Sequence, residues 1–431
     1  TWGGFGLALI RKQNASHIDE NSVFYFNVFI GVIACGILWI AAPFIASFYQ
    51  KSILVPLTRV LSLGLIINAL GMIHTTKLIK LIDFKTQTKV SIIAAFSSGC
   101  IGIFMSYRGF GVWSLVAQSL GSDIFRTVLL WKVHSWRPVL KISFDSLKNM
   151  FAFGSRMLIS DLLETIFNNV DLMVIGKVFT PADLGYYSKA VAFKKLPVDN
   201  VCTTIWRVAY PVFASMQENT VRIKHGTRMA LMSAATIVFP MMIGLAIVSK
   251  PLIIILLTEK WLPCVQYLQM LCVVGLLYPM HIINSNVLTT LGRSDLFLHC
   301  SIFEKCVSTA ALLICYRWGI VSIIFGQIVT SVVSLFLKCH YTKKLIVYSL
   351  YDQTKDLLPI MFLSILMGLG IIFIKYLTMF DITSLLIVQI SSGIFVFYIL
   401  CYIFKLSAFM EIDLIIRPKV VTFLKTFFEK G

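Results

Sequence analysis

Long apolar stretches are the feature that most constrains this chain of 431 residues. A helix that crosses a bilayer needs about 20 predominantly apolar residues, and twelve stretches approach or exceed that length. They lie at 23–48, 56–79, 88–106, 110–131, 150–176, 184–213, 229–257, 263–291, 296–316, 319–338, 357–378 and 382–404. The sequence therefore predicts an all-α integral membrane protein with about 12 full transmembrane helices.

Composition excludes a soluble globular protein. Hydrophobic residues make up 58% of the chain and charged residues 13%, whereas soluble domains carry about 25% charged residues. The net charge of +18 fits cytoplasmic loops of a membrane protein, so we expect no nucleic-acid partner. The ten cysteines are scattered singly through apolar runs, which is typical of small core residues rather than of a metal or disulfide framework.

The first ten residues form a short apolar segment that ends at Arg11 and Lys12. They lack the basic front and small-residue cleavage site of a signal peptide. We interpret this segment as the end of a helix whose beginning is missing, as in a fragment.

Loops rich in basic residues alternate along the chain with loops that have few, as the positive-inside rule requires. One side carries twenty-three lysines and arginines, among them Lys77, Lys132 and Lys338. The other side carries seven, which are Lys51, Arg108, Lys177, Lys250, Lys260, Arg317 and Lys375. This asymmetry supports the span count and predicts a cytoplasmic C-terminus.

The connections between the stretches are too short to build a domain outside the membrane. After Phe404, apolar residues recur among charges, which indicates an amphipathic helix on the inner membrane surface over 406–431. A frayed polar end is the alternative for this tail.

No Walker loop, GxSxG elbow, HExxH or loop acidic pair is present in the sequence, so the common catalytic templates lack their residues. Charges inside the spans are the remaining signal, because a charge facing lipid costs about 2.5–3.5 kcal/mol on insertion scales. Eight basic residues lie there: Arg59, Arg126, Arg156, Lys189, Lys194, Lys195, Arg207 and Lys305.

The stretch 150–176 places polar side chains on one helix face. Asp161, Glu164, Asn168 and Asp171 are spaced three, four and three residues apart, with Arg156 about a turn before them. The next stretch adds basic residues, so acids and bases of two antiparallel neighbours can meet. This pattern predicts a polar, hydrated interior.

Two interpretations of these residues stay open. In the first, Arg59, Arg156, Lys189 and Arg207 bind an anionic head group in a central cavity, and Asp161, Glu164 or Asp171 carries a coupling ion. In the second, the charges form structural ion pairs. Asn168 and Asn284 are further polar candidates for the cavity, and a hydrogen bond across helices is the alternative for Asn284. His74, His281 and His299 are isolated and fit packing or surface roles, and no metal site is expected.

Several segments resemble polysaccharide flippases of the lipopolysaccharide and colanic-acid exporter branch of the multidrug, oligosaccharidyl-lipid and polysaccharide (MOP) exporter superfamily. The residues that carry the resemblance are Phe5-Gly6, Ala8 to Lys12, Phe153-Gly154, Asn169, Ile175-Gly176-Lys177, Leu184 to Ala190, Leu196-Pro197, Arg207-Val208, Pro211 to Phe213, Glu259 to Trp261, Leu268-Gln269, Leu271-Cys272, Gly275-Leu276 and Gly292 to Asp295.

The resemblance implies a two-lobe helical bundle, with the twelve spans corresponding to the third to fourteenth helices of the family. The expected parts are an incomplete N-terminal lobe at 1–148, a six-helix lobe at 149–345, a terminal helix pair at 346–405 and the tail at 406–431. Asp161, Glu164 and Asp171 are not part of the family pattern, so their coupling role follows from their charge alone.

The resemblance also implies function. Such proteins move undecaprenyl-pyrophosphate-linked oligosaccharide across the bacterial inner membrane by alternating access, without covalent chemistry or a cofactor. The expected partners are the lipid-linked oligosaccharide, the lipid bilayer, a coupling H⁺ or Na⁺ and polysaccharide polymerase machinery. The alternatives are an ion-coupled small-molecule or multidrug antiporter of the same fold, a membrane glycosyltransferase, which the short outer loops disfavour, and a purely structural membrane protein.

Overall fold

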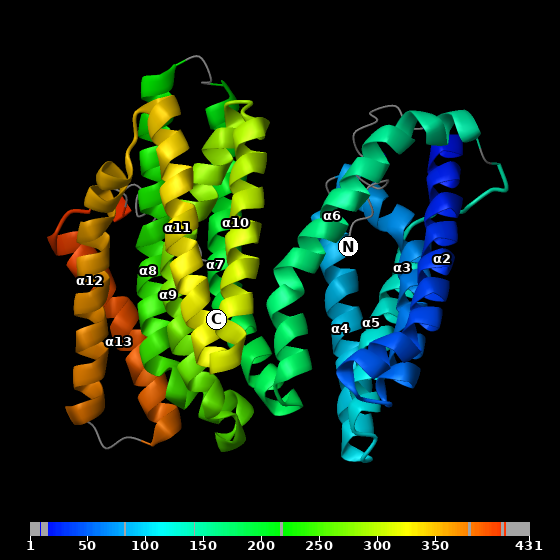
Figure 1. Ribbon diagram of the computed structural model, residues 1–431, viewed down its shortest axis with the longest axis horizontal. Helices are drawn as coiled ribbons and strands as arrows, with labels where there is room; N and C mark the ends of the chain where they lie inside the picture. The colour runs from blue at the N-terminus through cyan, green and yellow to red at the C-terminus, as the bar shows by residue number, and fades with distance from the viewer. Residues whose placement is uncertain are drawn as a thin grey trace, which may run out of the picture. The chain divides into compact units, whose positions relative to one another are not determined.

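The computed structural model describes residues 9, 16–81, 83–141, 143–215, 219–377, 381–406 and 409–410. Over these residues the regular structure is helical, with twelve long α-helices and two short 3₁₀ helices (Figure 1). Most of the segment 1–15 and the tail 411–431 fall outside the described residues, so the expected amphipathic tail helix stays a prediction.

Each of the twelve apolar stretches coincides with one long helix. The helices are α2 (His17–Tyr49), α3 (Leu54–Lys80), α4 (Phe84–Tyr107), α5 (Val112–Val133), α6 (Phe144–Val178), α7 (Pro181–Ser215), α8 (Thr220–Leu257), α9 (Pro263–Thr290), α10 (Ser294–Cys315), α11 (Ile320–Ile346), α12 (Leu350–Leu377) and α13 (Ile382–Ile403). Within the described part of the chain, nine helices are long and apolar enough to cross a membrane. The others, α5, α6 and α7, carry several of the charges that the sequence places inside spans.

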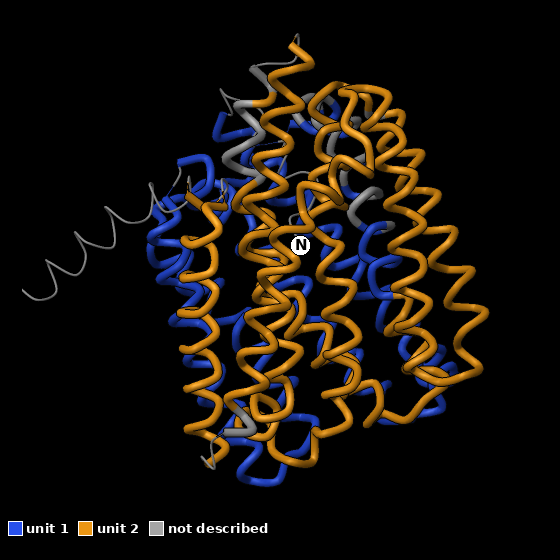
Figure 2. Tube along the Cα trace, turned by 90° about the vertical axis from the view of Figure 1, so that its left-hand side faces the viewer, with its two compact units in different colours: residues 1–169 blue, residues 170–431 orange. Residues whose placement is uncertain are grey.

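The chain divides into two compact units, residues 1–169 and 170–431, which Figure 2 colours separately. In unit 1, α2 packs on α3, α3 on α5, and α4 on α5. In unit 2, α9 contacts α7, α8 and α11, while α12 packs on α8 and α13. The four-part division expected from the sequence stays a prediction.

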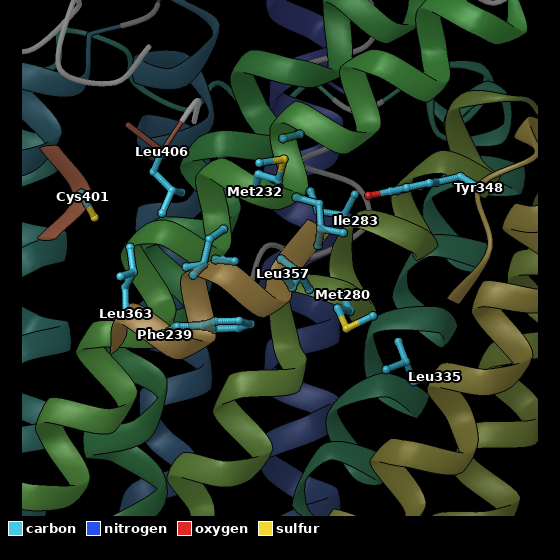
Figure 3. Packing of buried hydrophobic residues seen from close by; sticks show 14 of the residues in the cluster. Met232, Phe239, Met280, Ile283, Leu335, Tyr348, Leu357, Leu363, Cys401 and Leu406 are labelled. Carbon is cyan, nitrogen blue, oxygen red and sulfur yellow. The ribbon is translucent and has the colours of Figure 1, made fainter. Parts of the chain in front are cut away.

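Among the described residues, unit 2 holds two buried apolar clusters, one of which is contributed mainly by α8, α9, α11, α12 and α13. Phe239 of α8, Met280 of α9 and Leu357 of α12 lie within it, each less than a tenth exposed (Figure 3). Outward-facing side chains on the same helices, such as Phe362 and Phe373, are exposed. A chain with apolar residues both inside and outside its bundle is suited to lipid surroundings.

Residues that favour helix termini lie where the helices of the structure begin and end. Ser16 and Asp19 form a reciprocal capping box at the start of α2, which satisfies backbone donors that the first turn leaves free. Gly319 links the 3₁₀ turn Tyr316–Trp318 to α11 with φ of 97°, a conformation that glycine adopts without steric cost. This short turn joins α10 and α11, which pack against each other as antiparallel neighbours.

Candidate functional site

A hydrogen-bonded chain of polar side chains connects three helices of unit 2. Gln327 of α11 donates from Nε2 to Asp171 Oδ2 of α6 and contacts Tyr187 Oη of α7, at 2.7 Å in each case. Tyr187 is buried and Asp171 is half-buried. The structure thus places the predicted acid Asp171 inside the helix bundle of unit 2, and its hydrogen-bond partner is a neutral amide.

Basic residues lie near this carboxylate without pairing with it. The positive charges of Lys194 on α7 and Lys305 on α10 act electrostatically on Asp171. Among the described residues, no ion pair joins Asp171 to either lysine, so the ion pairs between α6 and α7 that the sequence suggested are not seen at this position. A carboxylate held by a neutral donor keeps acceptor capacity for a proton or a small cation.

The other predicted residues of α6 and α7 lie in different surroundings. Glu164 and Asn168 are exposed on α6, and Lys189 is exposed on α7. The side chains of Arg156, Asp161 and Arg207 lie outside the described part of the structure, so their predicted roles stay predictions.

Arg59 lies on α3 of unit 1, where its guanidinium stacks over the Trp39 ring at 5.1 Å from the ring centroid. Trp39 Nε1 also donates to the carbonyl oxygen of Arg59 at 3.1 Å. Arg59 Nε is buried and has no hydrogen-bond partner among the described residues. Arg59 is thus a partly buried cation that stacks on an aromatic ring and has a free N–H donor, and such a cation is suited to binding an anion.

Asn284 forms a reciprocal amide pair with Gln353 of α12. Asn284 Nδ2 donates to Gln353 Oε1 at 2.9 Å, and Gln353 Nε2 donates to Asn284 Oδ1 at 3.0 Å. Both side chains are almost fully buried. This is the cross-helix hydrogen bond that the sequence left as one alternative for Asn284, whereas a hydrated cavity around it stays a prediction.

The sequence analysis missed a charged cluster on α9, α10 and α11. Lys338 Nζ lies 2.7 Å from Glu304 Oε2 and 3.3 Å from His281 Nδ1, and His281 Nε2 lies 2.8 Å from Ser331 Oγ. Lys338 was counted as a loop cation, but the structure places it within α11 with 7% of the residue exposed. Glu304 is the residue from which this cluster could have been predicted, because an acid inside an apolar span needs a partner on a neighbouring helix.

The chain matches the sequence family described as polysaccharide biosynthesis protein over residues 1–266. That match covers more than half of the chain. The chain belongs to this family.

Curated relatives of this family member have related names. TuaB of Bacillus subtilis, a teichuronic acid biosynthesis protein, is 29% identical over 336 residues, which is 74% of this chain and 69% of the relative. WzxC of Escherichia coli, a lipopolysaccharide biosynthesis protein, is 23% identical over 361 residues, or 82% of this chain and 73% of the relative. ExoT of Rhizobium meliloti, a succinoglycan biosynthesis transport protein, is 25% identical over 261 residues, or 60% and 53% of the two chains.

Solved structures show the fold that the family member adopts. The lipid II flippase MurJ in an inward closed conformation matches with a TM-score of 0.75 at 16% identity, over 93% of this chain and 88% of MurJ. An inward-facing MATE family transporter of the MOP superfamily matches with a TM-score of 0.61 at 16% identity, over 80% and 86% of the two chains. This polysaccharide biosynthesis protein therefore has the MOP-superfamily fold expected from the sequence resemblance.

Proposed function

We propose that this membrane protein is a flippase that moves a lipid-linked oligosaccharide, the repeat unit of an O-antigen, capsule or exopolysaccharide, across the bacterial inner membrane. One observation carries the proposal: a chain of the polysaccharide biosynthesis family, similar to WzxC over 82% of its length, has the fold of the lipid II flippase MurJ. The fold alone would suit many transported molecules, so the family membership supplies the substrate class.

Transport in this proposal proceeds by alternating access and involves no covalent chemistry or cofactor. Arg59 is the first candidate to attract a pyrophosphate or an acidic sugar, because its buried Nε has no hydrogen-bond partner among the described residues. Lys189, exposed on α7, is a second candidate, and Arg156 and Arg207 complete the proposed set. Arginine suits this role because its planar donors match phosphate oxygens.

Energy would come from an ion gradient through H⁺ or Na⁺, since one charge moved through 100 mV gives about 2.3 kcal/mol. Asp171 is the candidate for ion binding that the geometry favours, because it is half-buried and its hydrogen-bond partner, the Gln327 amide, is neutral. Glu164, exposed on α6, and Asp161 are further candidates. Asn168 and Asn284 would line the polar path.

The proposal also includes the placement of the protein in the cell. The chain would be a multi-pass inner-membrane protein with a cytoplasmic C-terminus, as the loop charges predict. It would work beside polysaccharide polymerase machinery.

A complementation experiment tests the proposed function. The full-length gene is expressed in a host whose resident exporter is deleted and which makes a matching glycan, and surface polysaccharide is measured. Restored polysaccharide supports the flippase. Absence of polysaccharide despite verified membrane insertion would favour the small-molecule antiporter instead, for which the MATE likeness at a TM-score of 0.61 is the supporting observation.

A further inference from the structure

A basic hollow lies on unit 1 at the C-terminal end of α5, apart from the residues discussed above. It is a shallow, open depression with a volume of about 410 Å³. It is lined by Leu70, Thr127, Val128, Trp131, Lys132 and Arg137. Two of these six side chains are cationic and none is acidic.

The wall of the hollow is held in place by hydrogen bonds. Trp131 Nε1 donates to the carbonyl oxygen of Leu70 at 2.9 Å, which fixes the indole against α3. Arg137 Nη1 donates to the carbonyl oxygens of His134 and Trp136 at 2.7 Å each, and its guanidinium lies 5.6 Å from the Trp131 ring centroid. Lys132 is exposed and has no ion-pair partner among the described residues.

The exposed face of α5 next to the hollow changes from apolar to basic along the helix. Ile124 and Val128 are each 45% exposed, and Lys132 follows at the same four-residue spacing. Residues four apart lie on one helix face, so this face presents apolar side chains first and a cation at its end. A phospholipid has an apolar acyl chain followed by a charged head group, so its two parts match the apolar part and the cationic end of this helix face.

The geometry points to an anionic phospholipid as the ligand of this hollow. Its phosphate would bind between Lys132 and Arg137, while an acyl chain would lie along Val128 and Ile124. Trp131 has the amphipathic ring that favours the head-group level of a membrane. A free phosphate or pyrophosphate would share the contacts with the cations but would leave the apolar face unused.

The test uses the full chain purified in detergent and titrated with phosphatidylglycerol or phosphatidylcholine of the same acyl chains, with bound lipid counted by native mass spectrometry. We expect the tightest site to prefer phosphatidylglycerol. K132Q should weaken that site about fivefold and K132Q/R137Q about thirtyfold, since each cation near a membrane contributes about the same increment of affinity. Lys132 makes none of the wall contacts that Arg137 makes, so weaker lipid binding by K132Q cannot be attributed to misfolding of the wall.

The matched control is K85Q/K89Q, which removes two exposed cations four residues apart on α4. It should leave the tightest phosphatidylglycerol site unchanged. The proposal is overturned if K132Q/R137Q binds phosphatidylglycerol like the unaltered chain, or if the control weakens binding equally. Inorganic pyrophosphate that displaces phosphatidylglycerol at equal concentration would also overturn it, because the hollow would then bind phosphate rather than a lipid.

Discussion

Lys338 of α11 and Glu304 of α10 form an ion pair of 2.7 Å inside the helical bundle of unit 2. The side chain of Lys338 is 9% exposed and that of Glu304 is 37% exposed. His281 of α9 lies 3.3 Å from the same lysine, so the three side chains connect α9, α10 and α11. A buried lysine is costly unless it is paired, which makes each partner dependent on the other.

Lys338→Met should destabilise the protein by about 1–2 kcal/mol, because Glu304, with 37% of its side chain exposed, then loses its cationic partner. Lys338→Met combined with Glu304→Gln should recover most of that loss, since neither charge remains unpaired. Thermal unfolding in detergent measures both variants. Equal stability of the single and double variants would show that the two charges do not depend on each other.

Gln353→Leu should loosen the contact between α12 and α9. The change leaves Asn284 Oδ1 buried without the donor that Gln353 supplies, at a cost of about 1–3 kcal/mol. Thr354→Ala, at an exposed neighbour on α12, is the matched control and should change the unfolding temperature little. Asn284→Leu/Gln353→Leu should be more stable than Gln353→Leu alone, and the opposite order would contradict the amide pair.

Asp171→Asn should reduce transport at least tenfold while leaving membrane insertion intact. Asparagine keeps an oxygen that can accept from Gln327 Nε2, but it removes the charge that would bind H⁺ or Na⁺. Glu164→Gln, at an exposed position on the same helix, should have the smaller effect in the same surface-polysaccharide assay. Normal transport by Asp171→Asn together with loss of transport in Glu164→Gln would assign the ion to the other acid.

Arg59→Gln should lower transport because it removes the proposed anion-binding cation. Arg59→Lys, which keeps the charge and loses the planar donors, should recover part of the activity. Lys250→Gln removes an exposed cation from α8 and serves as the control for a general effect of charge. The anion-binding role fails if Arg59→Lys and Arg59→Gln transport equally well.

Apolar stretches in the sequence located the twelve long helices of the described residues, because an apolar stretch is a local property of the sequence, and nine of these helices are apolar enough to cross a membrane. The partners of polar residues are not local. Asn284 and Gln353 are 69 residues apart, and Asp171 and Gln327 are 156 apart, so only the packing of the helices brings them together.

Lys338 shows a second limit of sequence analysis. A lysine at the end of an apolar stretch has the same pattern whether it reaches the membrane surface or lies inside a helix bundle. Only the position of Glu304 on the neighbouring helix distinguishes the two cases, and the structure provides it. The surroundings of Arg59 could not be predicted from the sequence either, since its stacking on Trp39 depends on the packing of α2 against α3.

Translocation in proteoliposomes tests the proposed function most directly. The purified full-length protein is inserted into vesicles that carry a labelled undecaprenyl-pyrophosphate oligosaccharide, and the fraction of label exposed outside is followed over time with an impermeant reagent. We predict that label from the inner leaflet becomes accessible faster than in vesicles without protein, and that Arg59→Gln slows this exchange. Exchange no faster than in protein-free vesicles, with correct insertion verified, would contradict the account.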